Sequence, residues 1–305
     1  MDRTGKDHGM IRGETLLDVY PADLTAADLA TADRPTAERA IRNRVQTLYL
    51  GDGVMLARIL GRHKIFLHTS DRGFACHVAM DGFWEFWVTQ FFARMLKPGM
   101  VAVDVGANYG YYTLLFGEAV TASGRVLAVE PNPRAAALLR ETVLLNGIAG
   151  NTSVIQAALG PPGLSEARLF VPKGEPKNAQ LVGPEGAEHG ETVLVSVTTL
   201  DALTADFARV DLVKIDAEGA EVGIVAGMQM LIQKHRPALV LEFNAARYDD
   251  ARAFLDGLLA LYGQVFVVGF NGTAEPIAPE TILTTQIGED WMLYFPQDCT
   301  EGQPD

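Results

Sequence analysis

The chain has 305 residues, of which 48% are hydrophobic, and carries a formal net charge of −13 with a pI near 4.9. That acidity argues against a nucleic-acid-binding surface, because Lys and Arg supply most of the affinity for phosphates. The N-terminus lacks the apolar core of a signal peptide, no segment is long and apolar enough to cross a bilayer, and Cys76 and Cys299 are too few for a disulfide framework, so we expect a cytoplasmic protein with no membrane partner.

The first 97 residues predict an N-terminal extension of helices and short strands. A polar, Ala-rich helical stretch comes first, and short β-like runs follow at residues 54–60 and 65–69. A helix predicted from about Phe83 to Leu96 carries many aromatic residues, which favours burial. Glu85 is an acid in that aromatic setting and needs a partner, so it is a candidate contact of cofactor or acceptor.

From residue 98 to residue 305, short runs rich in Val, Leu and Ile alternate with helical patterns. This alternation predicts an α/β domain with a doubly wound, mostly parallel, seven-stranded sheet. Helices are predicted at residues 134–146 and 217–234, and the Pro-containing segment 271–289 predicts that the last two strands are antiparallel. The predicted strands are residues 101–105, 126–130, 153–157, 211–215, 238–242, 264–268 and 291–295.

Residues 160–190 interrupt the alternation with several Pro and Gly residues and scattered charge. The pattern predicts an inserted loop or hairpin. We expect this insert to be mobile without acceptor and to close over it as a lid. Asn178 and Gln180 are weaker candidates for hydrogen bonds to the acceptor.

The first predicted strand of this domain ends in a glycine turn, with the sequence DVGANYG from Asp104 to Gly110. Gly106 and Gly110 let the backbone approach a ligand, and the N–H groups at the following helix start favour an anionic group. The spacing is G-x-N-x-G, with Asn108 between the glycines, and it differs from the G-x-G-x-x-G of nicotinamide-binding turns. Asp104 would repel a pyrophosphate but can pair with the ammonium group of S-adenosylmethionine.

The second strand of the domain ends in Glu130, followed by Pro131. An acid about twenty positions after the glycine turn, at the end of the adjacent strand, can accept hydrogen bonds from both ribose hydroxyls. Gln156 and Ala157 end the third strand, where an adenine ring would lie. Pro131, Gln156 and Ala157 are therefore further candidates for cofactor binding.

Several segments together resemble the FkbM family of methyltransferases in order and spacing. They are VAVDVGANYGYYT, VLAVEPNP, LLNG, VTTLDAL, VDLVKIDAEGAE and RPALVLEFN, within residues 80–245. The resemblance implies a Rossmann-like class I methyltransferase sheet, S-adenosylmethionine as donor, and O-methylation of a hydroxyl, often on a sugar or natural product. By this resemblance the cofactor positions are Asp104, Gly106, Asn108, Gly110, Glu130 and the region of Ala157, and the family pattern also has an acid at Glu85.

Candidate catalytic residues follow the fourth strand, at the point where open sheets place their ligands. By resemblance the segment of Asp216 and Glu218 faces the methyl group, and a carboxylate there can act as the base that deprotonates a hydroxyl. Asp216 is the first choice and Glu218 the second, and Asp216 is also a candidate contact of the cofactor. Glu242, at the end of the fifth strand, either bonds the acceptor or joins Asp216 around a divalent cation, although we assign no metal ligands. Glu221 fits a structural role in the first turn of a helix.

Two other functions share some of these features. An NAD-dependent oxidoreductase would have the same sheet, glycine turn and Glu130, but the third glycine is missing. A catalytically silent nucleotide-binding module would keep the fold without transfer, and the intact acidic segment at Asp216 disfavours it. We expect a small-molecule or glycan acceptor and no nucleic-acid partner.

Overall fold

The computed structural model describes residues 22–183, 189–285 and 287–297. Cys299, the N-terminal segment up to residue 21 and residues 184–188 of the predicted insert lie outside the described residues. In the described part of the chain, no helix has the length and apolar character that crossing a membrane requires.

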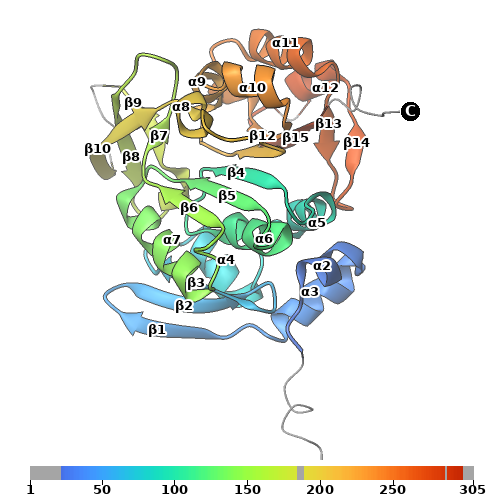
Figure 1. The fold of residues 1–305 in the computed structure, drawn as a ribbon. Coiled ribbons are helices and arrows are strands. Elements are labelled where there is room, and N and C mark those ends of the chain that lie inside the picture. The colour runs from blue at the N-terminus through green and yellow to red at the C-terminus, as the bar shows by residue number, and fades with distance from the viewer. Residues whose placement is uncertain (1–21, 184–188, 286, 298–305) are drawn as a thin grey trace, which may run out of the picture.

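The centre of the fold is an eight-stranded sheet with the order β14-β13-β15-β12-β11-β4-β5-β6 (Figure 1). Strands β12, β11, β4, β5 and β6 are parallel, whereas β15 runs antiparallel between β12 and β13. The predicted fold class is confirmed, all seven predicted strands are present, and the short β14 is an addition. The strands are β4 (Val101–Val105), β5 (Arg125–Val129), β6 (Thr152–Ile155), β11 (Leu212–Ile215), β12 (Ala238–Phe243), β13 (Phe266–Val268), β14 (Ala274–Pro276) and β15 (Trp291–Phe295).

Helices cover both faces of this sheet, as a doubly wound fold requires (Figure 1). Successive strand side chains point to opposite faces, so Ala102 packs in one hydrophobic cluster and Val103 in the other. One face is covered by α5 (Phe86–Met95), α6 (Tyr111–Val120) and α7 (Pro133–Leu145). The other is covered by α8 (Leu200–Thr204), α9 (Glu221–Ala226), α10 (Gln229–His235), α11 (Ala251–Tyr262) and α12 (Pro279–Thr284).

The prediction of one continuous helix over residues 217–234 is wrong, because the structure has two separate helices there, α9 and α10. The break comes at Gly227, where a Cβ atom would lie 2.2 Å from the carbonyl oxygen of Gly160. The first helix also begins only at Glu221, because Glu218 and Gly219 have positive φ angles of 51° and 99° and form a turn. A backbone contact and a left-handed turn therefore override the helical pattern.

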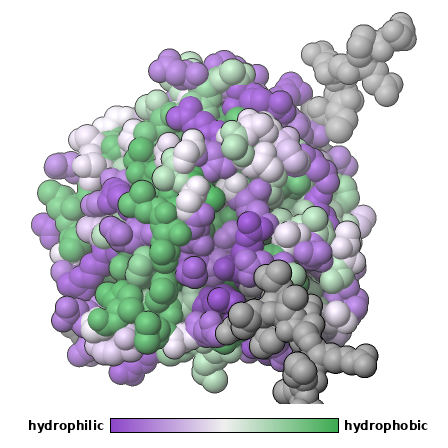
Figure 2. Space-filling view, turned by 60° about the horizontal axis from the view of Figure 1, so that its bottom comes forward, coloured by the Kyte–Doolittle hydropathy of each residue, from purple (hydrophilic) through white to green (hydrophobic). Residues whose placement is uncertain are grey.

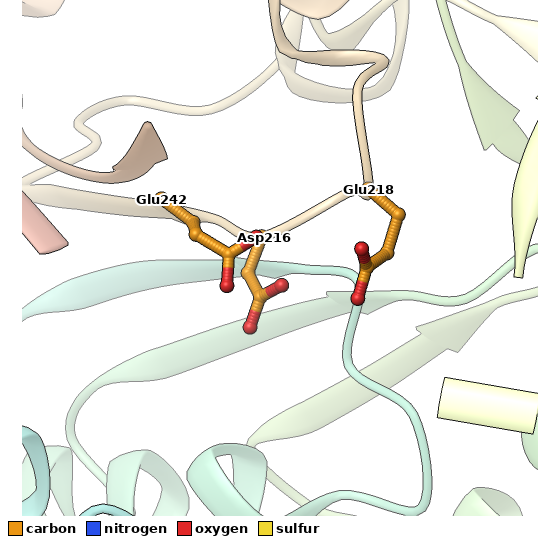
Figure 3. Close-up of side chains that lie close together, drawn as sticks. All are labelled: Asp216, Glu218 and Glu242. Atoms are coloured by element: carbon orange, nitrogen blue, oxygen red, sulfur yellow. The ribbon is translucent and has the colours of Figure 1, made fainter. Parts of the chain in front are cut away.

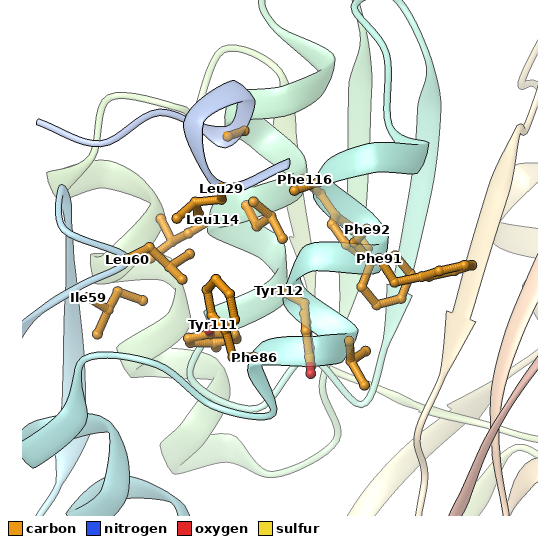
Figure 4. Packing of buried hydrophobic residues seen from close by; sticks show 14 of the residues in the cluster. Leu29, Ile59, Leu60, Phe86, Phe91, Phe92, Tyr111, Tyr112, Leu114 and Phe116 are labelled. Atoms are coloured by element: carbon orange, nitrogen blue, oxygen red, sulfur yellow. The ribbon is translucent and has the colours of Figure 1, made fainter. Parts of the chain in front are cut away.

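The N-terminal extension contains a three-stranded antiparallel sheet, β1-β2-β3, between pairs of helices. Hydrophobic side chains of the extension join those of α6 in one cluster, in which Leu29 lies near Leu114 (Figure 4). The predicted boundary between the extension and the α/β domain, at residues 97 and 98, stays a prediction. The elements before α5 are α2 (Ala26–Thr31), α3 (Arg34–Arg42), β1 (Thr47–Gly51), β2 (Val54–Ile59), β3 (His63–His68) and α4 (Phe74–Asp81).

The aromatic helix of the extension begins later than predicted, at Phe86. Glu85 directly precedes this helix and has a left-handed φ of 36°. It was predicted to be a helical residue, whereas in the structure it lies outside the helix. The aromatic residues pack as the sequence suggests, and Phe86 and Phe92 are fully buried.

The insert forms part of a second, four-stranded sheet with the order β7-β10-β8-β9. Strands β8 and β10 pair antiparallel, and a short 3-10 helix lies between β8 and β9. These elements are β7 (Ala158–Leu159), β8 (Glu166–Pro172), η1 (Pro176–Asn178), β9 (Gln180–Val182) and β10 (Gly190–Thr198).

Candidate active site

A cavity of about 300 Å³ lies at the carboxyl ends of the parallel strands. Open α/β sheets place their ligands at this edge. Of the site residues predicted from the sequence, the cavity is lined by Glu85, Gly106, Asn108, Glu130, Pro131, Ala157, Asp216, Glu218 and Glu242. Asp104, Gly110 and Gln156 are not among its lining residues.

The glycine turn between β4 and α6 needs its glycines for two different reasons. A Cβ atom on Gly106, whose φ is 72°, would lie 1.8 Å from the carbonyl oxygen of Asp216. A Cβ atom on Gly110, whose φ is 100°, would lie 2.4 Å from Leu139 of α7. Gly106 thus allows the turn to pack against the acidic loop, residues 216–221, whereas Gly110 allows the start of α6 to pack against α7.

Glu130 lies at the end of β5 with both carboxylate oxygens held by backbone groups. The N–H of Asn108 donates to Oε2 at 2.8 Å, and the N–H of Asn132 donates to Oε1 at 2.8 Å. Burial raises the pKa of Glu130 to about 7, although these two hydrogen bonds act in the opposite direction. The side chain is therefore fixed in the cavity wall, and each oxygen keeps acceptor capacity for a ligand.

Asp104 lies in the core next to the residues that line the cavity. It is fully buried beneath the cavity, where the hydroxyl of Thr113 donates to Oδ2 at 2.6 Å and Nζ of Lys214 lies 3.3 Å from Oδ1. Asp104 pairs with Lys214 in the parallel register of β4 and β11, and the two side chains lie on the same face of the sheet. A contact of Asp104 with the ammonium group of the donor stays a prediction.

Lys214 was not among the residues predicted from the sequence. It lines the cavity although its side chain is only 1% exposed, and its Nζ lies 3.5 Å from Oδ2 of Asp216. Burial alone would lower the pKa of Lys214, but Asp104 and Asp216 together raise it above the usual range. The sequence segment that contains Asp216 thus also contains a buried lysine that is stabilised in its charged form by two carboxylates.

Three carboxylates converge at the other end of the cavity, as Figure 3 shows. One oxygen from each of Asp216, Glu218 and Glu242 lies within 4.8 Å of the others. Hard oxygen ligands of this kind can hold a divalent cation. Within the described residues, these three form the group whose spacing would suit a metal ion.

Arg247 already supplies a cation to this cluster. Its Nη1 lies 2.5 Å from Oε2 of Glu242, and its Nη2 lies 3.1 Å from Glu218 and 3.0 Å from Asp290. Arg247 and Asp290 were missed in the sequence because both lie outside the recognised motifs. Arg247 ends the short 3-10 helix η2 (Ala245–Arg247) after β12, and Asp290 directly precedes β15.

Several carboxyl groups in the cavity have raised pKa values. Burial, followed by the charge of Asp216, raises the pKa of Glu218 to about 7 and that of Glu85 to about 7. The same two causes raise the pKa of Glu242 further, because Asp290 and Glu218 add their charges. The hydroxyl of Tyr112 donates to Glu85 at 3.2 Å. Carboxyl groups that titrate near neutral pH are suited to proton transfer.

Glu221 has the structural role that its position suggested. It is fully buried and accepts the N–H groups of Ala217 at 3.0 Å and Gly219 at 3.2 Å, and the hydroxyl of Tyr248 donates to it at 3.1 Å. Its carboxylate therefore holds the acidic loop in shape from below the cavity.

The roof of the cavity comes from the extension and the insert. Phe74 and Trp84 line it from the extension, and Lys177 and Asn178 line it from η1, whereas Gln180 does not. The two regions are joined by a hydrogen bond from the N–H of Arg72 to the carbonyl oxygen of Gly174, at 2.9 Å.

The sequence and the fold were compared with known proteins. The family model described as methyltransferase FkbM domain matches residues 104–267, more than half of the chain. Over 113 residues the chain is 34% identical to the protein-L-isoaspartate O-methyltransferase of Aeropyrum pernix, which covers 35% of this chain. The matched region spans 43% of that curated relative, less than half of its length.

Solved structures of methyltransferases are similar at low identity. Methyltransferase FkbM from Methylobacillus flagellatus KT is 17% identical with a TM-score of 0.40, over 69% of this chain and 53% of that chain. The precorrin-6y C5,15-methyltransferase of Geobacter metallireducens is 14% identical with a TM-score of 0.36, over 65% of this chain and 82% of that chain. With the family model matching more than half of its residues, the chain belongs to the FkbM methyltransferase family.

Proposed function

We propose that this methyltransferase uses S-adenosylmethionine to methylate a hydroxyl group of a small molecule or a sugar. One observation carries the proposal. A single cavity has Glu130 and the glycine turn at one end, and Asp216, Glu218 and Glu242 at the other. A nucleoside-binding end and a proton-accepting end thus share one enclosed space.

The residues of the first end fit the donor. Glu130 keeps lone pairs for two ribose hydroxyls, and Pro131 and Ala157 offer apolar surface for an adenine ring. Gly106 and Asn108 bring backbone to the wall at the methionine end. When bound, S-adenosylmethionine supplies a methyl group activated by its positively charged sulfur.

The charge of the cavity also suits that donor. Six carboxyl groups line it against three cationic side chains, and Lys214 among those cations is matched by the buried Asp104. Burial raises the pKa of four of these carboxyl groups to about 7 or above, and a cationic ligand beside them would favour their ionised form. Asp104 therefore serves the donor indirectly, because it neutralises a lysine that would otherwise repel a cation.

The acidic end positions and deprotonates the acceptor. Asp216 remains our first candidate for the base, since Lys214 holds its carboxylate toward the cavity. Glu218 is the alternative, because a pKa near 7 balances the ionised fraction against basicity. Arg247 orients Glu218 and Glu242 and keeps their mutual repulsion small.

A hydroxyl acceptor fits this end better than a carboxylate. A carboxylate needs no base, whereas a hydroxyl gains both a base and hydrogen-bond acceptors at this end. The relative from Aeropyrum pernix is by name an O-methyltransferase, which supports an oxygen acceptor. Trp84 and Asn178 in the roof offer a ring face and an amide to a sugar.

Ligand binding and transfer test the proposal separately. S-adenosylmethionine and S-adenosylhomocysteine should raise the melting temperature of the purified chain, whereas NAD should not, because a ligand that binds the native state stabilises it. A stabilisation by NAD alone would favour the oxidoreductase instead. Transfer of a labelled methyl group to a panel of sugars and small alcohols, compared with matched carboxylic acids, tests the acceptor class.

A further inference from the structure

The strand β1 forms one edge of the N-terminal sheet and pairs, within the described residues, with β2 alone. Its sequence from residue 45 to residue 51 is VQTLYLG, without charge and without proline. Natural proteins usually protect an open edge strand with charged residues or proline, because unpaired N–H and C=O groups recruit another strand. This edge carries neither of these devices.

The opposite edge of the same sheet is closed by side chains of α7. The N–H of Lys64 donates to Asn146 Oδ1 at 2.9 Å, and the amide of Asn146 donates back to the carbonyl of Lys64 at 2.6 Å. The N–H of Phe66 donates to the hydroxyl of Thr142 at 3.1 Å. Side chains of α7 thus protect one edge of this sheet, whereas the other edge has no strand partner among residues 22–183, 189–285 and 287–297.

The alternation of the ladder identifies which β1 groups point outward. Lys64 and Phe66 face away from β2, so their partners Arg58 and Leu56 face β1, and the N–H of Arg58 donates to the carbonyl of Gln46 at 2.8 Å. The backbone N–H and C=O groups of Leu48, which lies opposite Leu56, therefore point toward β2. The backbone groups of Thr47 and Tyr49 point to the open edge.

The side chains of this edge are apolar and exposed. Leu48, Tyr49 and Leu50 are 61%, 63% and 48% exposed. Leu48 pairs across the sheet with Leu56, and Leu56 with Phe66, so an apolar row crosses the outer face. Figure 2, in which the side of the molecule that bears this sheet comes forward, shows a band of hydrophobic surface. Exposed apolar surface of this kind marks an interaction site.

The charge of the chain favours this face for contact between two copies. Residues 1–97 contain 13 Lys and Arg against 12 Asp and Glu, so the remaining residues hold a net charge of −14. Two copies that meet through the catalytic part would repel each other, whereas the extension is nearly neutral. Antiparallel pairing of β1 with itself also brings the Arg44 end of one strand beside the Asp52 end of the other.

We propose that two copies of this chain pair through antiparallel contact of their β1 strands, which joins the two N-terminal sheets into one of six strands. Centred on Leu48, Thr47 of one copy faces Tyr49 of the other, and their outward N–H and C=O groups satisfy each other. Such a two-fold contact uses the same patch on both copies. It places the two Leu48 side chains opposite each other, so that they bury part of their exposed surface against one another.

The mass of the full chain in solution tests the pairing. Light scattering after gel filtration, at about 1 to 100 µM protein, should give twice the 33.0 kDa of one chain. Tyr49→Pro removes an outward N–H but no backbone hydrogen bond to β2, so it should yield a folded monomer. Leu48→Lys should also yield a monomer, whereas Met230→Lys, at an exposed apolar residue of α10, should stay dimeric.

A cross-link locates the contact independently of these variants. In a background with Cys76→Ser and Cys299→Ser, Leu48→Cys should form a disulfide between two chains on mild oxidation, because facing residues that are not hydrogen-bonded bring their Cβ atoms close. Met230→Cys should not. A wild-type chain that stays monomeric at about 100 µM overturns the proposal, even if its apolar face binds lipid vesicles instead. A dimer that Leu48→Cys fails to cross-link overturns it as well.

Discussion

The ammonium group of Lys214 lies 3.3 Å from the carboxylate of Asp104 in a part of the core where both side chains are almost completely buried. The same ammonium group reaches Asp216 at 3.5 Å, so one lysine links the strand before the glycine turn to the acidic loop. A buried pair of this kind adds little stability by itself, but the loss of one partner leaves an uncompensated charge. The pair therefore connects folding to the shape of the site.

We expect Lys214→Met to lower the free energy of unfolding by about 3 to 5 kcal/mol, because Asp104 would remain buried without its cation. Urea denaturation measures this change. The double variant Asp104→Asn with Lys214→Met should recover most of the loss, since it buries no unpaired charge. Equal stability of the wild type and the single variant would contradict this interpretation of the pair.

Glu130→Ala should weaken the binding of S-adenosylmethionine by at least one to two orders of magnitude, because even one hydrogen bond to a charged acceptor contributes roughly 1.5 to 3 kcal/mol. Calorimetric titration gives the dissociation constant directly. Glu141→Ala, at an exposed position of α7, is the matched control and should leave the constant unchanged. An unchanged constant in the Glu130 variant would remove this residue from the donor site.

Asp216→Asn should keep donor affinity within a few-fold while the transfer rate falls by roughly 100-fold or more, as expected for a base. Asparagine keeps the shape of the side chain but does not take a proton at neutral pH. Donor affinity comes from titration and the rate from single-turnover transfer of a labelled methyl group. A loss of rate wholly matched by lost binding would instead make Asp216 a ligand of the donor.

The pH profile distinguishes the two candidate bases. If Glu218 is the base, the rate in the wild type should rise with pH and level off above about 7, because only its ionised form accepts a proton. In Glu218→Gln that rise should then disappear together with most of the activity. A variant that keeps the activity and the pH profile of the wild type would leave the role of base to Asp216.

The raised pKa of Glu218 also makes a prediction for stability. Its folded pKa of about 7 lies above the ordinary value of 4.5, so its contribution to stability falls as pH rises between these values. Glu218→Gln does not ionise, and its free energy of unfolding relative to the wild type should therefore rise across this window, by up to about 3 kcal/mol. Urea denaturation at several pH values from 5 to 8 measures the difference. A difference independent of pH would falsify the raised pKa.

The insert should open and close over the site, as we expect from the sequence. Lys173 and Lys177 flank Gly174, whose hydrogen bond to Arg72 joins the insert to the extension. Limited trypsin digestion should cut at one of these lysines first, and S-adenosylhomocysteine with an acceptor should slow that cut. First cleavage within residues 22–160 or 199–297, or cleavage that ligands do not slow, would speak against a lid.

Most of the main sheet could be predicted because its strands are short apolar runs bounded by turn residues. The antiparallel position of β15 followed from the prolines before it, and Glu130 from its distance to the glycine turn. The break between α9 and α10 could not be predicted in this way. It depends on the approach of Gly227 to the backbone of Gly160, which is 67 positions away in sequence.

The site was predicted less completely than the sheet. Asp104 belongs to the motif of the turn, but the orientation of its side chain depends on the pleat of β4 and on Lys214 of the neighbouring strand. Arg247 and Asp290 come from separate segments and meet only in the fold. A single sequence identifies such residues poorly, because no local pattern marks a partner that approaches from a distant segment.

The contact between Gly106 and Asp216 has a consequence for engineering this enzyme. Because no side chain fits between them, the glycine turn and the acidic loop tolerate little independent variation. A mutant library aimed at new acceptors should therefore keep both segments and randomise Trp84, Lys177 and Asn178 in the roof. Grafting the roof from a relative would then change which molecules are methylated while leaving the handling of the donor intact.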